Sequence, residues 1–390
     1  MIESKYIIGN YGESFMITKR IALDLKLTYN YDYALEDLLF FDIETTGFSA
    51  DSSYLYLIGC IYYEDNSFHL IQWFSENINE EEKLIGSFFD FIKAYKVLIH
   101  YNGSGFDIPY IQKKCFSLKL PYTLDNIVSF DIYKKIYPYK KIFNLPNLKQ
   151  KTIELFLKIQ RKDTFNGGDL IEVYQSFIGK RRLENLRNIR EPNYISDKPS
   201  EADILLHTLL LHNEDDLKGL VLISSILNYV DIFEKPFQIT NAVINDNTLN
   251  IEFEIGSSVM TPFSYRLDNI RFDVNNTLAT LRIDIYEGEL KFYYENYKEY
   301  YYLPAEDKAI HKSVAAYVDK DFKVKAKPST AYTRKSGTFV PQYESLISPF
   351  FKHNQADKIS FLEVHTDFLL QEEHLEQYVS HLLDYIIKSK

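Results

Sequence analysis

The stretch Leu38-Leu39-Phe40-Phe41-Asp42-Ile43-Glu44-Thr45-Thr46-Gly47 decides the fold of this chain. Its first four residues form an apolar run that is typical of a buried strand. Asp42 and Glu44 lie two residues apart, so on a strand their side chains point to the same face. Two carboxylates at the end of an apolar strand are costly to bury unless a cation lies between them. The stretch therefore predicts a divalent-metal site at the end of a buried strand.

Two further segments repeat this pattern of acids beside apolar residues. The first, His100-Tyr101-Asn102-Gly103-Ser104-Gly105-Phe106-Asp107, follows a strand candidate, and the second, His212-Asn213-Glu214-Asp215-Asp216, lies in a helical pattern. Together the three segments supply four carboxylates: Asp42, Glu44, Asp107 and Asp216. A phosphodiesterase that uses two metal ions about 3.5–4 Å apart needs such a set. Carboxylate oxygens suit Mg²⁺ or Mn²⁺ rather than Zn²⁺, so we expect two ions of that kind.

His212 is the candidate catalytic base. It lies four residues before Asp216, so both side chains fall on one helix face, where His212 is placed to orient or deprotonate an attacking water. Asp215 is expected to point away from the ions or to support a ligand. Plainer interpretations stay open: Asp42 or Glu44 as an ordinary strand-end acid, Asp107 as a helix cap before Ile108-Pro109, and His212 as a helix-surface histidine.

The composition of the chain indicates its cellular compartment and limits its kinds of binding partner. The chain has 390 residues, 46% of them hydrophobic, and a net charge of −11. This length suits two domains, and the negative charge argues against a general nucleic-acid coat but not against a nuclease with local basic patches. Cys60 and Cys115 give no pairing or metal-ligand pattern, which favours a reducing cytoplasm. We expect no signal peptide and no membrane segment.

The sequence changes character near Pro236. Residues 38–232 alternate strand and helix patterns, which predicts an α/β domain with strands at 38–44, 54–63, 67–74 and 97–101. Ser200 is the expected N-cap of its last helix. Residues 1–37 are expected to form leader strands packed on that domain, and residues 236–390 an α+β accessory domain rich in antiparallel strands. The boundary is placed at 232–240.

Local patterns in the second domain predict two hairpin turns and two helices. The turns are Asn245-Asp246-Asn247 and Glu287-Gly288-Glu289, because Asn, Asp and Gly favour the backbone of tight hairpins. The helices are expected at 305–318 and, as an amphipathic terminal helix, at 371–387. No complete set of catalytic residues follows residue 232.

Basic residues gather in two segments of this acidic chain. The first contains Lys134, Lys135, Lys140, Lys141, Lys149, Lys151, Lys158, Arg161 and Lys162. The second contains Lys320, Lys323, Lys325, Lys327, Arg334 and Lys335, with Phe322, Tyr332, Phe339 and an expected turn at Ser336-Gly337. Lysine and arginine beside aromatic rings suit phosphate contact and base stacking, although charge runs are often plain solvated surface. We expect nucleic-acid contacts from Lys140, Lys141 and Arg161 in the first segment, and from Lys325, Lys327, Arg334 and Lys335 in the second.

Three motifs in order resemble a known family. Asp42-x-Glu44, Asn102-x-x-x-Phe106-Asp107 and His212-x-x-x-Asp216 resemble the motifs of the DEDD (DnaQ-like) exonucleases of the RNase H-like superfamily. Between them, Leu148-Lys149, Glu154, Arg161-Lys162-Asp163, Gly168-x-Leu170 and Tyr174 resemble the connecting segment of the YprB-like branch. The similarity covers residues 38–230. The histidine subgroup of DEDD enzymes places its base five residues before the last Asp, whereas the spacing here is four, as in the YprB-like branch.

This resemblance implies a function. It implies an RNase H-like mixed sheet flanked by helices, two-metal catalysis, and a 3′→5′ exonuclease that acts on single-stranded ends or on DNA with 3′ ends. It also implies that Thr45, Thr46 and Gly47 approach the terminal nucleotide, that Phe48 wedges against its base, and that Asn102 binds the substrate backbone. For these the alternatives are a plain glycine turn and an Asx turn. The branch is associated with DNA repair and with a helicase partner. The competing hypothesis is a non-catalytic nucleic-acid-binding or helicase-associated scaffold that keeps the fold.

Overall fold

The chain forms two compact units. The computed structural model describes residues 6–7, 16–162, 167–191, 198–365, 368–369 and 371–389. Unit 1 consists of Met1–Lys140 and Asn144–Leu227, and unit 2 of Lys141–Phe143 and Asn228–Lys390. Each unit has its own sheets and its own buried residues, so each is described by itself.

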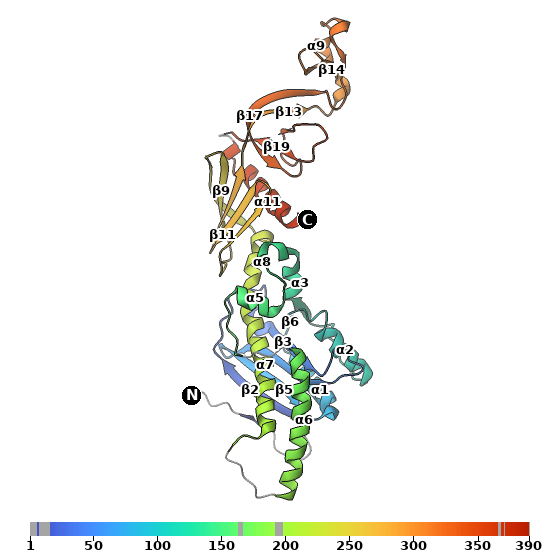
Figure 1. Ribbon diagram of the computed structural model, residues 1–390, viewed down its shortest axis with the longest axis vertical. Coiled ribbons are helices and arrows are strands. Elements are labelled where there is room, and N and C mark those ends of the chain that lie inside the picture. Colours follow the sequence, from blue (N-terminus) through green and yellow to red (C-terminus); the bar gives the residue numbers. More distant parts are fainter. Residues whose placement is uncertain are drawn as a thin grey trace. The chain divides into compact units, whose positions relative to one another are not determined.

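Unit 1 is built on a seven-stranded mixed sheet (Figure 1). Its strand order is β1-β2-β5-β4-β3-β6-β7, and β3, β6 and β7 run parallel while the other pairs are antiparallel. The strands are β1 (Tyr6–Ile7), β2 (Met16–Leu23), β3 (Leu38–Thr45), β4 (Leu55–Glu64), β5 (Ser67–Ser75), β6 (Val97–His100) and β7 (Val128–Asp131). This mixed sheet with flanking helices confirms the predicted α/β, RNase H-like fold class.

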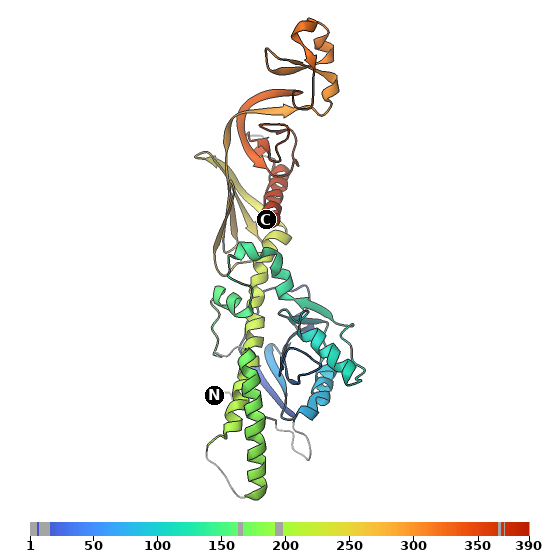
Figure 2. The ribbon, with the colours of Figure 1, turned by 45° about the vertical axis from the view of Figure 1, so that its right-hand side comes forward.

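Helices cover both faces of this sheet: α1 (Glu81–Ile92) and α2 (Asp107–Ser117) pack on one face, and α6 (Gly167–Arg190) and α7 (Glu201–Ile223) on the other. The shorter helices are α3 (Ile132–Ile136), α4 (Lys140–Phe143), which runs into unit 2, and α5 (Gln150–Phe156). Helices α6 and α7 lie side by side in both views (Figure 1, Figure 2). The Ser200 hydroxyl accepts a hydrogen bond from the Asp203 N–H, and the Asp203 side chain accepts one from the Ser200 N–H, so the predicted N-cap is confirmed as a capping box.

The alternation of β3 separates its apolar side chains from its acids. Leu39, Phe41 and Ile43 join the core that the sheet forms with α1 and α2, where the Phe41 ring stacks on Phe88 with centroids 5.0 Å apart. Because neighbouring strand residues point to opposite faces, Asp42 and Glu44 point to the face that α7 covers. The fold thus brings the acids of β3 under a long helix.

The core on that second face fixes α6 and α7 against the sheet. It contains Tyr56, Leu57 and Phe74 from the strands, Leu170, Tyr174 and Phe177 from α6, and Ala202, Leu209 and Leu210 from α7. The rings of Tyr56 and Tyr174 stack with centroids 4.1 Å apart. Buried aromatic contacts of this kind stabilise a single packing of helix on sheet, which the site on α7 requires.

The described residues of unit 2 form three antiparallel sheets. The five-stranded sheet has the order β10 (Phe263–Leu267), β11 (Ile270–Asn275), β12 (Leu278–Asp284), β9 (Thr248–Ile255) and β8 (Phe237–Asn245). The four-stranded sheet has the order β13 (Tyr286–Tyr293), β17 (Tyr332–Gln342), β19 (Ser360–Glu363) and β18 (Phe350–Phe351). The three-stranded sheet has the order β15 (Lys308–His311), β14 (Tyr300–Leu303) and β16 (Val324–Lys325).

Helices also occur among the described residues of unit 2. They are α8 (Leu227–Glu234), which begins at the last residue of unit 1, α9 (Lys312–Ala315) and α11 (Glu372–Lys388). The terminal helix predicted at 371–387 is therefore confirmed. The turn at Asn245-Asp246-Asn247 is also confirmed, since it joins β8 to β9 and both Asp246 and Asn247 have positive φ angles.

Three local predictions in unit 2 are wrong. The helix expected at 305–318 is instead strand β15 followed by the single turn of α9, because pairing of β14 with β15 outweighs the helix propensity of the alanines and lysines. The turns expected at Glu287-Gly288-Glu289 and Ser336-Gly337 lie inside β13 and β17, where Gly288 pairs with Gly337. The Tyr286 ring lies over Gly288 and the Phe339 ring over Gly337, so these glycines make room for aromatic side chains rather than for a turn.

Candidate active site

The approach of α7 to the sheet depends on a glycine in β4. Gly59 pairs with Asp42 across the ladder, and a Cβ atom at Gly59 would lie only 2.0 Å from the Asn213 side-chain oxygen. The side chain of Asn213 fills this space: its Nδ2 donates to Asp42 Oδ2 at 2.8 Å, and its Oδ1 accepts from Gln72 Nε2 at 2.9 Å. The amide therefore docks α7 on the acids of β3.

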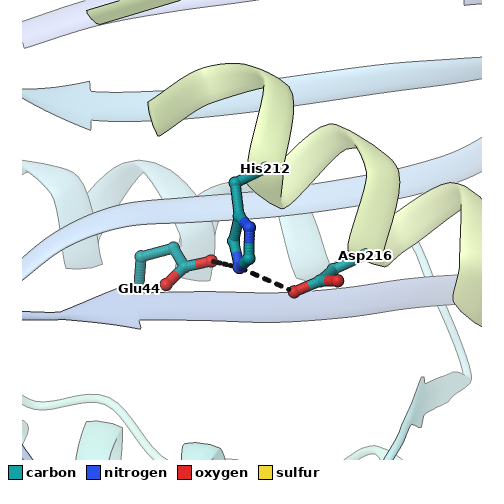
Figure 3. A group of neighbouring side chains, drawn as sticks. All are labelled: Glu44, His212 and Asp216. Carbon is teal, nitrogen blue, oxygen red and sulfur yellow. Dashed lines mark ion pairs between the residues drawn. The ribbon is translucent and has the colours of Figure 1, made fainter. Parts of the chain in front are cut away.

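This docking brings the first and third sequence motifs together. His212 Nε2 lies 3.2 Å from Asp216 Oδ2 and 3.7 Å from Glu44 Oε1, and Figure 3 shows the imidazole between the two carboxylates. Among the described residues, these three side chains form a group whose ligand atoms all lie within 4.8 Å of one another. The His212 side chain is buried, so the helix-surface alternative for this residue is wrong.

Asp107 reaches the same place from α2. It is the first residue of that helix, and the N-cap is Phe106, so the capping alternative for Asp107 is wrong. Burial is the main reason that the pKa of its carboxyl is raised to about 7; the charges of Asp131 and Asp216 act in the same direction, and backbone hydrogen bonds at Asp107 and Ile43 oppose it. The bond at Ile43 places this carboxyl beside β3 at the residue between Asp42 and Glu44.

The acids repel one another in this arrangement. Burial raises the pKa of Asp42 well above its usual value, and the nearby charges of Asp107 and Asp216 add to this, while Asn213 opposes it. Burial also acts to raise the pKa of Asp216, but hydrogen bonds and charge from His212 and Arg161 outweigh it and lower the value. A divalent cation would relieve this repulsion, and the oxygen-rich donor set fits Mg²⁺ or Mn²⁺.

The structure adds two residues, Asp131 and Glu154, that the sequence analysis did not predict to belong to the site. Asp131, at the end of β7, accepts hydrogen bonds from the backbone N–H groups of Asn102 at 2.9 Å and Ser104 at 3.3 Å, so it shapes the turn before Asp107. Glu154 is buried beside Arg161. Asp131 is the last residue of the four-residue strand β7, so an acid at a strand end was the available signal, whereas nothing local distinguishes Glu154.

Arg161 lies inside the acid cluster. Its guanidinium bonds Asp216 and Glu154, and its side chain is only 11% exposed. Asp215 is also buried and accepts a hydrogen bond from the Lys162 N–H at 2.8 Å, in keeping with the expected supporting position. The nucleic-acid contact expected of Arg161 stays a prediction that these inward bonds do not favour.

The turn after β3 is braced internally. Thr45 Oγ1 donates to the Gly47 carbonyl at 2.8 Å, and Thr46 Oγ1 accepts from the Tyr54 N–H at 2.8 Å. Phe48 is 86% exposed, and its ring meets Phe106 edge-on with centroids 6.2 Å apart. A large exposed aromatic beside a buried acid cluster is suited to contact a base.

Asn102 and the basic residues expected to contact nucleic acid differ in exposure and in the partners that they bind. Asn102 has a φ of 59° and is held by Asp131. In unit 1, Lys140 lies over the Tyr137 ring at 4.8 Å, and in unit 2 Lys141 donates to the Ser389 carbonyl at 2.5 Å. Lys325 and Lys327 are exposed. Arg334 pairs with Glu289 and Asp307, and Lys335 with Glu363, so acids already offset these two charges.

Comparison with known proteins supports the superfamily. Residues 39–228 match the model of the RNase_H superfamily, a span that runs from β3 into α8 and includes all four acids and His212. No curated protein matches the sequence. Among solved structures, the family B DNA polymerase from the hyperthermophilic archaeon Pyrobaculum calidifontis is similar with a TM-score of 0.31 and 13% identity. That similarity covers 65% of this chain and 33% of the polymerase chain.

The match confirms the RNase H-like part of the expected resemblance for this region. Its DEDD character and its place in the YprB-like branch stay predictions. No helix within the described part of the chain has the length and apolar character needed to cross a membrane.

Proposed function

We propose that unit 1 is a divalent-metal-dependent 3′→5′ exonuclease of DNA or RNA. The observation that carries this proposal is the convergence of acids from β3, α2 and α7 on one buried place beside His212. Burying several carboxylates together costs stability, and proteins accept that cost mainly at functional sites. The superfamily match over residues 39–228 supports nuclease or phosphodiesterase chemistry for this unit. The 3′ polarity rests on the resemblance of the three motifs to DEDD exonucleases.

Four carboxylates would hold the metal ions: Asp42, Glu44, Asp107 and Asp216. When bound, two Mg²⁺ or Mn²⁺ ions supply positive charge that polarises the scissile phosphate and acidifies the attacking water. The repulsion between Asp42, Asp107 and Asp216 supports this assignment, because a cation would favour the ionised form of each carboxyl.

His212 would take the proton of the attacking water. Its Nε2 atom faces Asp216 Oδ2 at 3.2 Å and Glu44 Oε1 at 3.7 Å, so an imidazolium formed there is stabilised by neighbouring negative charge. The turn at Thr45-Thr46-Gly47, with Phe48 and Asn102, would hold the terminal nucleotide. Stacking of Phe48 on a base requires an unpaired end, which favours single-stranded 3′ ends.

Unit 2 would bind nucleic acid or a partner, with Lys325, Lys327, Arg334 and Lys335 as candidate contacts. A cytoplasmic DNA-repair role and a helicase partner follow from the resemblance and belong to this proposal. The alternative, a scaffold that binds nucleic acid without cleaving it, would keep the fold and lose the chemistry.

The deciding experiment is cleavage of an oligonucleotide labelled at its 5′ end. A 3′→5′ exonuclease gives a ladder that shortens with time and releases mononucleotides in Mg²⁺ or Mn²⁺ but not in EDTA. A 3′-labelled copy should release its labelled nucleotide at once, and matched DNA and RNA strands give the preference between them. Binding without metal-dependent release would support the scaffold instead.

A further inference from the structure

We propose that Arg161 is a positioning residue that holds Asp216 so that only one carboxylate oxygen faces the metal site. The proposal deepens the proposed function, on which it rests. It assigns to Arg161 a task inside the protein in place of the phosphate contact expected from the sequence.

The geometry of the guanidinium carries the proposal. Arg161 Nη1 lies 3.0 Å from both carboxylate oxygens of Glu154, and Nη2 bonds Asp216 Oδ1. The two acids are thus joined through one planar fork. Glu154 is only 1% exposed, and its carboxylate fixes the guanidinium at Nη1 while Asp216 is bonded at Nη2. A planar fork with several donors can hold two carboxylates at once, which a lysine ammonium on a flexible stem does poorly.

The surrounding segment is tied to α7 at several points. A Cβ atom at Gly219 would lie 2.1 Å from Glu154 Oε1, so a glycine is needed for α5 to approach the helix. Gln150 Nε2 donates to the Asp216 carbonyl at 2.8 Å and to Glu154 Oε1 at 3.0 Å. Together with the bond from the Lys162 N–H to Asp215, these contacts clamp both the backbone and the side chain of the third motif.

The two oxygens of Asp216 are therefore used differently. Oδ1 bonds Arg161, whereas Oδ2 lies 3.2 Å from His212 Nε2 on the side of Glu44. Arg161 leaves Oδ2 directed at the place where the acids converge. Without the guanidinium, Asp216 keeps its contact with His212 but loses the bond at Oδ1 that fixes its orientation, and the site loses a preorganised ligand.

The test measures Mn²⁺ binding to the full chain without nucleic acid, by electron paramagnetic resonance or calorimetry. We expect R161Q to weaken Mn²⁺ binding by about 10- to 100-fold, as loss of a residue that orients a ligand typically does. E154Q should weaken it less, and R161K should recover only part of the loss. The control K158Q removes an exposed positive charge from the same segment and should leave Mn²⁺ binding unchanged.

A second measurement separates positioning from phosphate contact. Oligonucleotide binding in EDTA should keep its affinity and salt dependence in R161Q, whereas loss of one phosphate contact would lower the slope of log affinity against log salt by about 0.7 for a single strand. Because R161Q leaves Glu154 buried without its partner, R161Q/E154Q is the variant to use if R161Q unfolds. Unchanged Mn²⁺ binding in the folded variants, or a lower salt slope, would overturn the proposal. Wild-type protein that binds Mn²⁺ but cleaves nothing would instead overturn the proposed function and leave this inference standing.

Discussion

The two units of the molecule differ in where they place charged side chains. Unit 1 buries acids from three separate elements around His212, although burial and, after it, their mutual repulsion raise the pKa of Asp42 and Asp107. Unit 2 places its basic residues on the surface, where Lys325 and Lys327 are exposed and Arg334 and Lys335 pair with acids. Buried like charges cost stability and need a functional reason, whereas exposed ion pairs contribute little to it.

This difference predicts separable effects. Changes to the acid cluster should alter chemistry, metal binding and stability together, because those residues share one buried place. Changes to the basic surface of unit 2 should alter affinity for long nucleic acids alone. If changes in one unit altered both the chemistry and the affinity for long nucleic acids, this contrast between the units would be wrong.

The largest effect is expected from D42N and D107N. Each variant should lower turnover in Mg²⁺ by about 10³-fold or more, since a metal ion contributes several kcal/mol to the stabilisation of transition-state charge. The thermal midpoint in EDTA should stay unchanged or rise, because loss of a negative charge relieves repulsion. The matched control is D90N, which alters an acid on the exposed face of α1. Near-normal cleavage by either variant would remove that carboxylate from the metal site.

The next effect concerns His212. If it accepts the proton of the attacking water, H212A should lower turnover by about 10²–10⁴-fold and leave oligonucleotide binding nearly unchanged. The acid limb of the pH–rate profile should disappear with the imidazole. The control is H207A, an exposed histidine on the same helix. Full activity of H212A would assign the proton transfer to solvent.

Patterns that are local in sequence were sufficient to predict much of unit 1. The alternation around Asp42 and the spacing of His212 and Asp216 concern residues a few positions apart, so strand and helix geometry alone places them on common faces. The capping box at Ser200 is local in the same sense. These features therefore needed no knowledge of which elements meet in space.

The errors and omissions share a different origin. Gly288 and Gly337 looked like turn residues, but they pair with each other between distant strands, and such pairing is not visible in either stretch alone. Arg161 was expected to contact nucleic acid, because its bond to Asp216 joins positions 55 residues apart and is not visible in the basic segment alone. The position of Arg161 beside Asp216 depends on Gly219 and Glu154, which allow α5 to pack against α7.

A smaller effect links the acid cluster to pH. The pKa of Asp107 is raised to about 7, and that of Asp42 is also raised, so the folded metal-free protein holds protons that the unfolded chain releases above about pH 4. Stability without metal should therefore fall as pH rises from about 4 to about 7. Mg²⁺ competes with those protons, so the increase in melting temperature that it causes should grow from about pH 6 to about pH 8. Thermal melts with and without Mg²⁺ test this, and D107N should flatten the metal-free slope. If Mg²⁺ raised the melting temperature equally at every pH, the raised pKa values of Asp42 and Asp107 would be contradicted.

The smallest effect is expected on the basic surface of unit 2, where two pairs of residues can be compared directly. K325Q/K327Q should lower the slope of log affinity against log salt for a long single strand by about 0.7 for each phosphate contact that is lost, and turnover on short oligonucleotides should not change. R334Q/K335Q should lower it less, because Glu289, Asp307 and Glu363 already offset these charges. The measurement is binding over a salt series in EDTA, which separates affinity from cleavage. If neither pair changes the slope, this surface does not carry the nucleic acid and is better explained as a docking site for a protein partner. If K325Q/K327Q instead slows cleavage of short substrates, unit 2 takes part in the chemistry. The division into a catalytic unit with buried acids and a binding unit with exposed lysine and arginine side chains is then wrong.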